Sequence, residues 1–304
     1  MNKSISIIVP VFNEEGSIKP FLKSVCEELK NINYSLEIIF IDDGSKDNTV
    51  GDIKEEMEKN RNIVLLEFSR NFGKEAAMTA GLDYAKGDAV IPMDVDLQDP
   101  PKLIHKFIEK WEEGYHTVYG VRTSRTDDSK SKKTSANLFY RLFNRISDTH
   151  IPHNAGDFRL MDRRVVDVIK SLPERNRFMK GLFAWPGFSS IGVGYSRPSR
   201  AVGRSKFNGW KLWNFAVDGI TSFSTWPLRI WSYIGVGIAI ASLVFMMTII
   251  GRTLIFGVNW PGYASIMSAI LFFGAVQLIS IGILGEYIGR LYTESKKRPI
   301  YIIK

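Results

Sequence analysis

The sequence predicts an α/β domain followed by two membrane-spanning helices, and three observations support this. Apolar runs alternate with helical patterns over residues 1–100, two long stretches near the C-terminus carry no charge, and 304 residues exceed one small domain. The composition, with 45% hydrophobic and 24% charged residues, is that of a globular protein. It excludes a disordered, collagen-like or coiled-coil chain.

Four short apolar runs, rich in β-branched residues and bounded by turn residues, predict strands that are buried on both faces. They cover residues 5–11, 36–41, 63–68 and 89–93. Helical spacing and polar first residues predict helices between these strands. The helices cover residues 17–31, 48–60 and 74–85. This alternation predicts a parallel, doubly wound sheet that binds its ligands at the carboxyl ends of the strands.

Acidic loops follow three of these strands. Asn13-Glu14-Glu15 follows the first, Asp42-Asp43-Gly44-Ser45 the second, and a loop that begins Asp94-Val95-Asp96-Leu97-Gln98 the fourth. Two carboxylates one residue apart at a strand end are suited to a hard divalent cation that keeps positions open for phosphate oxygens. Mg²⁺ or Mn²⁺ held by Asp94 and Asp96 would stabilise a diphosphate leaving group.

Other phosphate, metal and nucleophile motifs are excluded. Residues 71–74, Asn-Phe-Gly-Lys, only resemble part of a phosphate-binding P-loop, and no G-x-G-x-x-G follows the first strand. The four histidines lack the spacing of metal ligands. The one cysteine, Cys26, cannot form an internal disulfide, which suits a reducing compartment, and we expect it to be buried on a helix.

Residues 122–145 form a basic segment, in which seven Lys and Arg residues stand against Asp127 and Asp128. Two interpretations stay open: a solvated helix face, or a surface that attracts anionic lipid or a phosphorylated ligand. A nucleic-acid ligand is excluded, because few aromatic residues are interleaved with these cations.

Residues 230–251 and 253–285 carry no charge, and each stretch exceeds the ~20 apolar residues that cross a bilayer. The loop between them holds one basic residue, Arg252, whereas five Lys and Arg residues follow the second stretch. The positive-inside rule therefore predicts a multi-pass protein of the inner (plasma) membrane with its α/β domain in the cytoplasm. Glycines in the second stretch and just after it suit a homo-oligomer.

The expected organisation has four parts: a catalytic domain (1–205), an amphipathic juxtamembrane segment (206–228), two transmembrane helices (229–288) and a basic cytoplasmic tail (289–304).

Several ordered motifs carry a resemblance to a known family. They are residues 8–14 (IVPVFNE), 42–45 (DDGS), 94–98 (DVDLQ), 156–159 (GDFR) and 203–207 (GRSKF). The chain resembles the family 2 glycosyltransferases with the GT-A (Rossmann-like) fold, in their polyprenyl-phosphate branch. That branch includes dolichyl-phosphate mannose synthase and the bactoprenol (undecaprenyl-phosphate) glucosyltransferases of O-antigen modification. The resemblance covers essentially the whole chain.

The resemblance implies inverting transfer of glucose from UDP-glucose to undecaprenyl phosphate on the cytoplasmic face of the membrane. Its substrate-binding residues would be Pro10, Phe12, Glu14, Asp43, Asp94, Gln98, Arg159 and Arg200. Its catalytic residues would be Asp157, Arg122 and Lys206, and the metal ligands Asp94, Asp96 and Gln98. The family often has a tyrosine where this chain has Phe12, so base stacking would survive and a hydroxyl contact would be lost.

Several alternatives stay open. Asp157 is either a base or an orienting group, and an ion pair with Arg159 would make it structural. The donor sugar could instead be mannose or an aminopentose, on another nucleotide. A catalytically inactive membrane scaffold is the alternative of a different class. A processive polysaccharide synthase is disfavoured, because the Q-x-x-R-W signature is missing and two spans are few for a channel.

Overall fold

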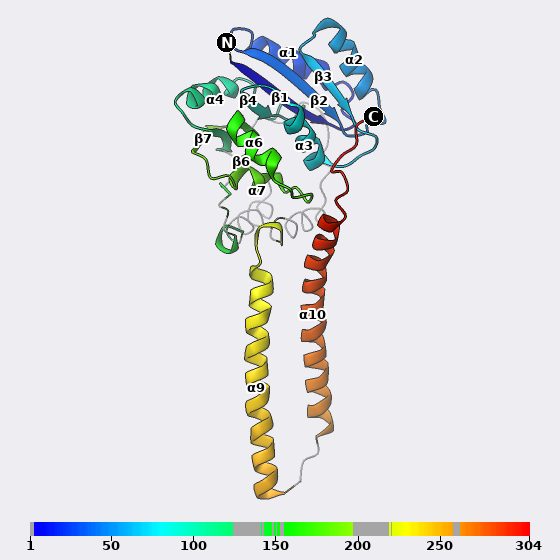
Figure 1. Cartoon of the computed structure of the whole chain (residues 1–304), viewed down its shortest axis with the longest axis vertical. Coiled ribbons are helices and arrows are strands. Elements are labelled where there is room, and N and C mark those ends of the chain that lie inside the picture. Colours follow the sequence, from blue (N-terminus) through cyan, green and yellow to red (C-terminus); the bar gives the residue numbers. More distant parts are fainter. Residues whose placement is uncertain are drawn as a thin grey trace.

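The computed structural model describes residues 3–123, 141, 143–147, 149, 151–152, 155–196, 219, 221–257 and 262–304. An α/β domain lies at one end of the molecule, and two long helices extend from it side by side (Figure 1). Arg200, Lys206 and most of the predicted basic and juxtamembrane segments lie outside the described residues.

The first half of the domain is a parallel sheet, as predicted. Its strands are β1 (Ser4–Val11), β2 (Ser35–Asp42), β3 (Ile63–Glu67) and β4 (Ala89–Pro92). The helices between them are α1 (Ile18–Glu28), α2 (Thr49–Lys59) and α3 (Lys74–Tyr84). The strands lie in the order β3-β2-β1-β4, and every neighbouring pair is parallel. The carboxyl ends of all four strands therefore meet at one edge of the sheet.

The second half turns the sheet into a mixed one. It consists of α4 (Leu103–Glu112), β5 (Thr117–Arg122), β6 (Ala155–Asp162), α6 (Arg163–Ser171), α7 (Met179–Ala184) and β7 (Ser190–Tyr195). β6 lies between β4 and β5 and is antiparallel to both. The predicted parallel sheet was based on residues 1–100, and it does not extend to this half, where mixed strand directions are common in large sheets.

Apolar side chains fill both faces of the sheet. One buried cluster joins the sheet to α1, α2 and α4, and a second joins it to α3, α6 and α7. Close packing on the second face requires a glycine in α3, since a Cβ at Gly81 would lie 2.9 Å from the Cβ of Ile8. The domain is therefore doubly wound, with helices on both faces.

Cys26 is exposed on α1, so the prediction that it is buried is wrong. The buried face of α1 consists of Ile18, Phe21, Leu22 and Val25, which follow the i, i+3, i+4, i+7 spacing of an amphipathic helix. Cys26 comes one residue after this stripe, and the rotation of about 100° per residue turns it away from the core.

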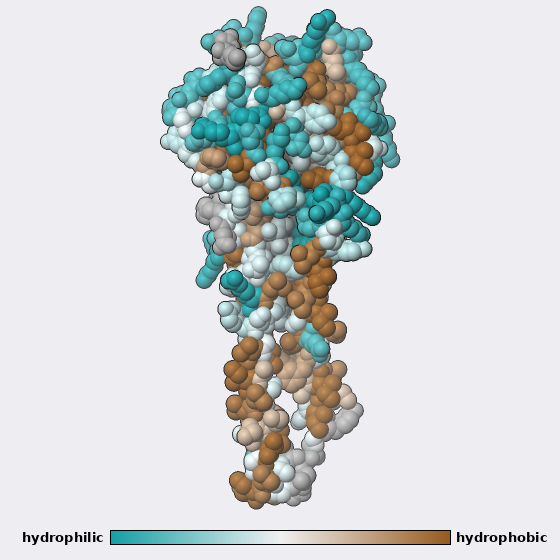
Figure 2. Space-filling view, viewed as in Figure 1, coloured by the Kyte–Doolittle hydropathy of each residue, from teal (hydrophilic) through white to brown (hydrophobic). Residues whose placement is uncertain are grey.

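The first charge-free stretch lies within the long helix α9 (Trp226–Phe256), and residues 263–285 of the second lie within α10 (Tyr263–Ser295). Both helices are long and apolar enough to cross a membrane. Their side chains form an exposed hydrophobic surface over most of the hairpin, in contrast to the largely hydrophilic surface of the domain (Figure 2). Exposed apolar surface of this extent is typical of contact with lipid.

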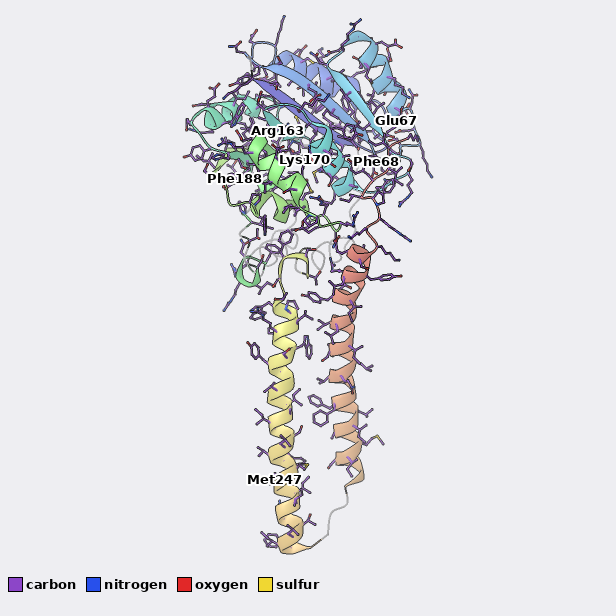
Figure 3. The ribbon with its side chains drawn as sticks, in the orientation of Figure 1. Glu67, Phe68, Arg163, Lys170, Phe188 and Met247 are labelled. Atoms are coloured by element: carbon purple, nitrogen blue, oxygen red, sulfur yellow. The ribbon has the colours of Figure 1, made fainter. Side chains whose placement is uncertain are left out.

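Beyond α10 the chain returns to the sheet and pairs with its edge. Ile303 forms an antiparallel bridge with Phe68, directly after edge strand β3. The Ser69 N–H donates to Ile302 O at 2.9 Å, and the Lys304 N–H donates to Glu67 O at 2.9 Å. Figure 3 labels Glu67 and Phe68 where the C-terminal chain passes the domain. This pairing covers an open sheet edge and ties the helical hairpin to the domain.

Replacing Tyr301 with alanine is expected to lower the melting temperature of the domain by several degrees. The Tyr301 ring stacks on Phe68 at 5.3 Å between centroids, and its hydroxyl donates to Asp83 at 2.8 Å. Tyr301→Phe keeps the stack and should lose about 1 kcal/mol, the net value of one hydrogen bond. Thermal unfolding of the purified chain measures both changes. An unchanged melting temperature in the alanine variant would show that the tail does not stabilise the domain.

Candidate functional site

The candidate site lies at the edge of the sheet where the parallel strands end. β6 completes it, because its antiparallel register pairs Ala89 with Asp162 and Val90 with Met161. Asp94 follows β4 by two residues and Asp157 lies in β6, so both carboxylates lie at this edge of the sheet. Two residues that are 63 positions apart in the sequence therefore face the same site.

A lysine joins these two carboxylates. Lys74 Nζ lies 2.6 Å from Asp94 Oδ1 and 3.1 Å from Asp157 Oδ2. Lys74 is the first residue of α3, and the turn before it uses Gly73 with φ +98°, a conformation that favours glycine. The Lys74 side chain is 43% exposed, so the ion-pair cluster is open to an incoming ligand. Sequence analysis missed Lys74, although it noticed residues 71–74 as a partial P-loop.

The opposite charges of this cluster stabilise one another in their ionised forms. Burial by itself would raise the pKa of Asp157, but the positive charges of Lys74 and Lys180 outweigh it and hold that pKa well below its usual range. Burial would likewise lower the pKa of Lys74, and the charges of Asp94 and Asp157 raise it instead. Asp157 is therefore an anion at neutral pH and a weak base, which suits it to orienting a cation better than to removing a proton.

Asp43 holds the turn that precedes Lys74. It is 4% exposed, and its carboxylate accepts hydrogen bonds from the Phe72 N–H at 2.6 Å and the Gly73 N–H at 2.9 Å. Burial raises the pKa of Asp43, and these two bonds oppose that shift. The structure thus gives Asp43 a contact with the loop after β3 that the predicted role in nucleotide binding did not include.

The loop after β1 lies beside the loop after β2, because Val11 pairs with Asp42 at the ends of β1 and β2. Pro10, Phe12 and Glu14 are half-buried along this edge. The backbone N–H of Glu14 donates to Thr49 Oγ1 at 2.9 Å. The structure therefore brings together the four residues that the sequence analysis assigned to the nucleotide: Pro10, Phe12, Glu14 and Asp43.

The loop after β4 presents the predicted metal ligands. Asp96 Oδ1 accepts a hydrogen bond from the Gln98 N–H at 3.2 Å, and Leu97 between them has φ +54°. Within the described ranges, no group of three or more His, Cys, Asp or Glu side chains could hold a metal. The donor set fits Mg²⁺ or Mn²⁺ held by one or two carboxylates and completed by substrate phosphate oxygens, and does not fit an all-protein cage.

Arg122 reaches the site from the end of β5. A Cβ at Gly156 would lie 3.3 Å from Arg122 Nη2, so the glycine lets the guanidinium lie over β6 next to Asp157. Burial would lower the pKa of Arg122, but a hydrogen bond with Tyr195 and the charges of Asp99 and Asp157 raise it. The Tyr195 hydroxyl in turn donates to Asp99 at 2.5 Å. These partners fix the Arg122 guanidinium as a positive charge beside Asp157.

Arg159 points into the core of the domain. It is 5% exposed, its Nη2 donates to Gly156 O at 2.7 Å, and its guanidinium lies 4.2 Å from the centre of the Phe183 ring. The ion pair of Asp157 runs to Lys74, although the charge of Arg159 still helps to lower the pKa of Asp157. Arg159 therefore lies on the core side of the site, where it contacts the backbone of β6.

Two family models match the chain. The model described as glycosyl transferase family 2 matches residues 6–170, which include the acidic loops and the Asp94–Lys74–Asp157 cluster. This chain is a family 2 glycosyltransferase. The model described as the GtrB C-terminal hairpin matches residues 226–291 of the glycosyltransferase, which hold α9 and most of α10. Its α/β domain has the GT-A fold.

Relatives match the glycosyltransferase over its whole length. It is 54% identical over 300 residues to the bactoprenol glucosyl transferase of Shigella phage SfV, covering 99% of this chain and 98% of that protein. It is 50% identical over 303 residues to the uncharacterized glycosyltransferase sll0501 of Synechocystis sp., covering 100% of this chain and 95% of that protein.

A solved structure shows a weaker similarity. Glucosyl-3-phosphoglycerate synthase from Mycobacterium tuberculosis, crystallised with Mn²⁺, UDP-glucose and phosphoglyceric acid, covers 72% of this chain and 78% of that one, with 18% identity and a TM-score of 0.47. This similarity is too low to transfer the ligands of that protein to the glycosyltransferase.

Glu75, next to Lys74 in the glycosyltransferase, is a second residue that the sequence analysis missed. Its carboxylate accepts a hydrogen bond from the Met179 N–H at 3.3 Å. Burial, together with the negative charge of Asp157, raises the pKa of Glu75 to about 8. The folded state therefore keeps a proton on Glu75 at pH values where an unfolded glutamate has already lost it.

Glu75→Gln is expected to stabilise the glycosyltransferase at high pH. The stability contributed by protonated Glu75 is fully present below the ordinary glutamate pKa of 4.5 and is lost as the pH rises through about 8. Because one pKa unit corresponds to about 1.4 kcal/mol, the neutral glutamine should gain at least about 1 kcal/mol at pH 9.

Thermal unfolding between pH 4.5 and 9 measures this effect. The melting temperatures of variant and parent should coincide at pH 4.5 and diverge up to about pH 8. Glu109→Gln, at an exposed position of α4, is the matched control and should follow the parent. Parallel curves for Glu75→Gln and the parent would contradict the raised pKa.

Proposed function

We propose that this glycosyltransferase transfers glucose from UDP-glucose to undecaprenyl phosphate, with inversion at the anomeric carbon. The observation that carries the proposal is the Asp94–Lys74–Asp157 cluster, which lies beside the D-x-D loop in a domain joined to two apolar helices. Identity of 54% to a bactoprenol glucosyl transferase, over 99% of this chain, supports both the sugar and the lipid acceptor.

The donor would bind along the edge of the sheet formed by β1, β2 and β4. Phe12 would stack on the base, and Glu14 and Asp43 would contact the nucleoside beside Pro10. Asp94, Asp96 and Gln98 would hold Mg²⁺ or Mn²⁺, which supplies positive charge to the diphosphate when it is bound. These roles are supported by the meeting of the three loops at one edge, and by the two-carboxylate donor set.

The acceptor phosphate needs little help from a base. Its second pKa is about 6, so much of it is already a dianion at neutral pH and can attack the anomeric carbon directly. The low pKa of Asp157 agrees with an orienting role for this carboxylate. Lys74 and Arg122 would offset the repulsion between two anionic substrates, together with Arg200 and Lys206, which lie outside the described residues.

The helical hairpin would confine the enzyme to the layer that holds its acceptor. A polyprenyl chain stays in the bilayer, so tethering the catalytic domain raises the effective concentration of the acceptor phosphate. The excess of basic residues after α10 supports a plasma-membrane protein with a cytoplasmic domain. A Cβ at Gly274, Gly282, Gly285 or Gly289 would meet nothing within 4 Å, which leaves room for a second copy in a homo-oligomer.

The direct test supplies the purified protein with undecaprenyl phosphate, Mg²⁺ and a panel of radiolabelled nucleotide sugars. We expect lipid-extractable label from UDP-glucose, and a β-linked product by NMR, because inversion reverses the α-linkage of the donor. Transfer from GDP-mannose alone or from a UDP-aminopentose alone would show that this sugar, and not glucose, is transferred. The absence of transfer from every donor would favour the inactive scaffold.

A further inference from the structure

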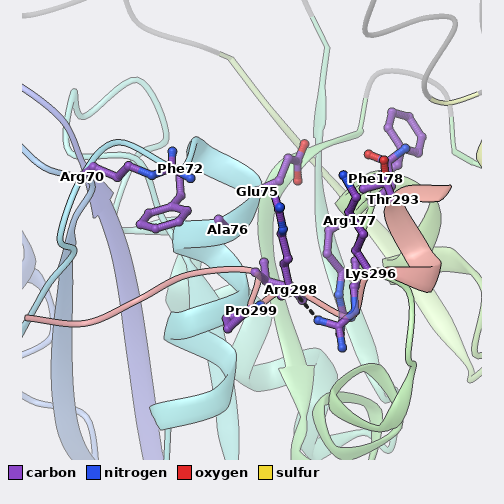
Figure 4. A pocket seen from close by; sticks show the side chains of 13 residues that line it. Arg70, Phe72, Glu75, Ala76, Arg177, Phe178, Thr293, Lys296, Arg298 and Pro299 are labelled. Carbon is purple, nitrogen blue, oxygen red and sulfur yellow. Dashed lines mark hydrogen bonds between the residues drawn. The ribbon is translucent and has the colours of Figure 1, made fainter. Parts of the chain in front are cut away.

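A cavity of about 430 Å³ lies between the start of α3, the loop before α7 and the end of α10 (Figure 4). Its volume falls within the range of small-molecule sites. Five basic side chains and one carboxylate are among its lining residues: Arg70, Arg175, Arg177, Lys296, Arg298 and Glu75. None of the residues assigned above to the donor, the metal or the acceptor lines it.

Carboxylates act on the cations of this cavity only from a distance: among the described residues, the charges of Glu174, Asp83 and Glu294 reach Arg177. Within the described part of the chain, none of the five cations forms a salt bridge. Arg70 stacks on Phe72 at 4.0 Å and donates to a backbone carbonyl. Arg177 donates to two backbone carbonyls, at 3.1 and 2.8 Å, and its buried Nε has no hydrogen-bond partner among the residues that the structure describes.

One of these carboxylates, that of Glu294, is occupied by the backbone of the loop before α7. The Glu294 carboxylate accepts the N–H groups of Arg175 and Asn176 at 2.8 and 3.0 Å, so its hydrogen bonds run to backbone and not to a guanidinium. Arg175 in turn donates through Nη1 to the carbonyl of Arg298. The loop and the tail are thus held together by hydrogen bonds between side chains and backbone groups, and the five cations line the cavity beside them (Figure 4).

We propose that this cavity binds a water-soluble diphosphate group. Guanidinium groups present paired donors that match phosphate oxygens, and cations gathered in a concave site focus a positive potential on an anion. Several cations from three segments suit two linked phosphates better than a single carboxylate, which one arginine can satisfy.

The position of the cavity favours a ligand from the aqueous phase over a membrane lipid. The charge-free stretch of α10 ends at Gly285, and the cavity residues begin at Thr293, about 12 Å further along the helix at 1.5 Å per residue. The headgroup layer on each side of a bilayer is about 5–7 Å thick. The cavity would therefore stand in water above the lipid phosphates, an argument that rests on α10 crossing the membrane as proposed.

The test uses the full-length chain in phosphatidylcholine nanodiscs and measures binding of inorganic pyrophosphate by calorimetry. EDTA is present, so that the metal-dependent donor site does not contribute. Lys296→Gln/Arg298→Gln is expected to weaken binding at least tenfold. Lys297→Gln/Lys304→Gln removes the same charge from the same tail outside the cavity lining and should stay within twofold of the parent.

Three results would overturn the proposal: equal weakening in the two double variants, unchanged affinity in Lys296→Gln/Arg298→Gln, or loss of pyrophosphate binding when phosphatidylglycerol is added to the nanodiscs. The last result would assign the cavity to a lipid headgroup. Asp96→Ala should keep the pyrophosphate affinity while losing sugar transfer, so failure of this site and failure of the proposed function are distinguishable.

Discussion

Replacing Lys74 with methionine is expected to lower the rate of sugar transfer by about 10²–10³-fold, the usual effect of removing a well-placed charge stabiliser. The ammonium contacts Asp94 at 2.6 Å and Asp157 at 3.1 Å. Without it, the two carboxylates repel each other, and the pKa of Asp157 loses the nearby positive charge that lowers it. The site would then lose a positive charge where a diphosphate must bind. Single-turnover transfer of labelled glucose into the lipid extract measures the loss.

Two variants separate the role of this charge from general effects. Lys170→Met removes a lysine from α6 that donates to the Asp83 carbonyl at 3.0 Å, away from the cluster, and should keep the rate within twofold. Lys74→Arg keeps the charge and should recover part of the rate. If Lys74→Met transfers sugar as fast as the parent, the ion pairs of Lys74 are structural and do not take part in transfer.

Asp96→Ala is expected to abolish transfer and to make the protein insensitive to added Mg²⁺ or Mn²⁺. The D-x-D loop offers two carboxylates, and a divalent cation held by so few protein ligands depends strongly on each of them. The parent enzyme should lose its activity in EDTA and regain it when either metal is restored. Initial rates at fixed UDP-glucose, with and without chelator, provide the measurement.

The control for this variant is Asp167→Ala, which removes an exposed carboxylate that lies 3.5 Å from Arg163 on α6. It should leave the metal dependence unchanged. Both variants should remain in the membrane fraction, because neither residue lies in α9 or α10. Substantial transfer by the parent enzyme in EDTA would refute the metal role of Asp96.

Local patterns predicted the first half of the domain well. The strand predicted over residues 36–41 is observed as Ser35–Asp42, and the helix predicted over residues 48–60 is observed as Thr49–Lys59. Parallel strands covered on both faces are continuous apolar runs, so they can be read from the sequence alone. The D-x-D loop was found for the same reason, because it follows such a run directly.

Lys74 could not be found in this way. It is one charged residue at the start of a helix, and nothing local distinguishes it from the other lysines of the chain. Its importance comes from two partners, 20 and 83 positions further along the sequence, that β4 and β6 bring within reach. The direction of β6, which the sequence did not predict, decides that Asp157 is one of them.

The amino-acid sequence by itself determined the parallel half of the sheet, the acidic loops at its edge and the two apolar helices, because each depends on residues that are close together in the chain. The tertiary structure alone decided which charges meet. It paired Lys74 with Asp94 and Asp157, placed residues 301–304 along the sheet edge, and brought five cations together around one cavity. Such contacts depend on strand order and direction, which arise from packing of the whole chain.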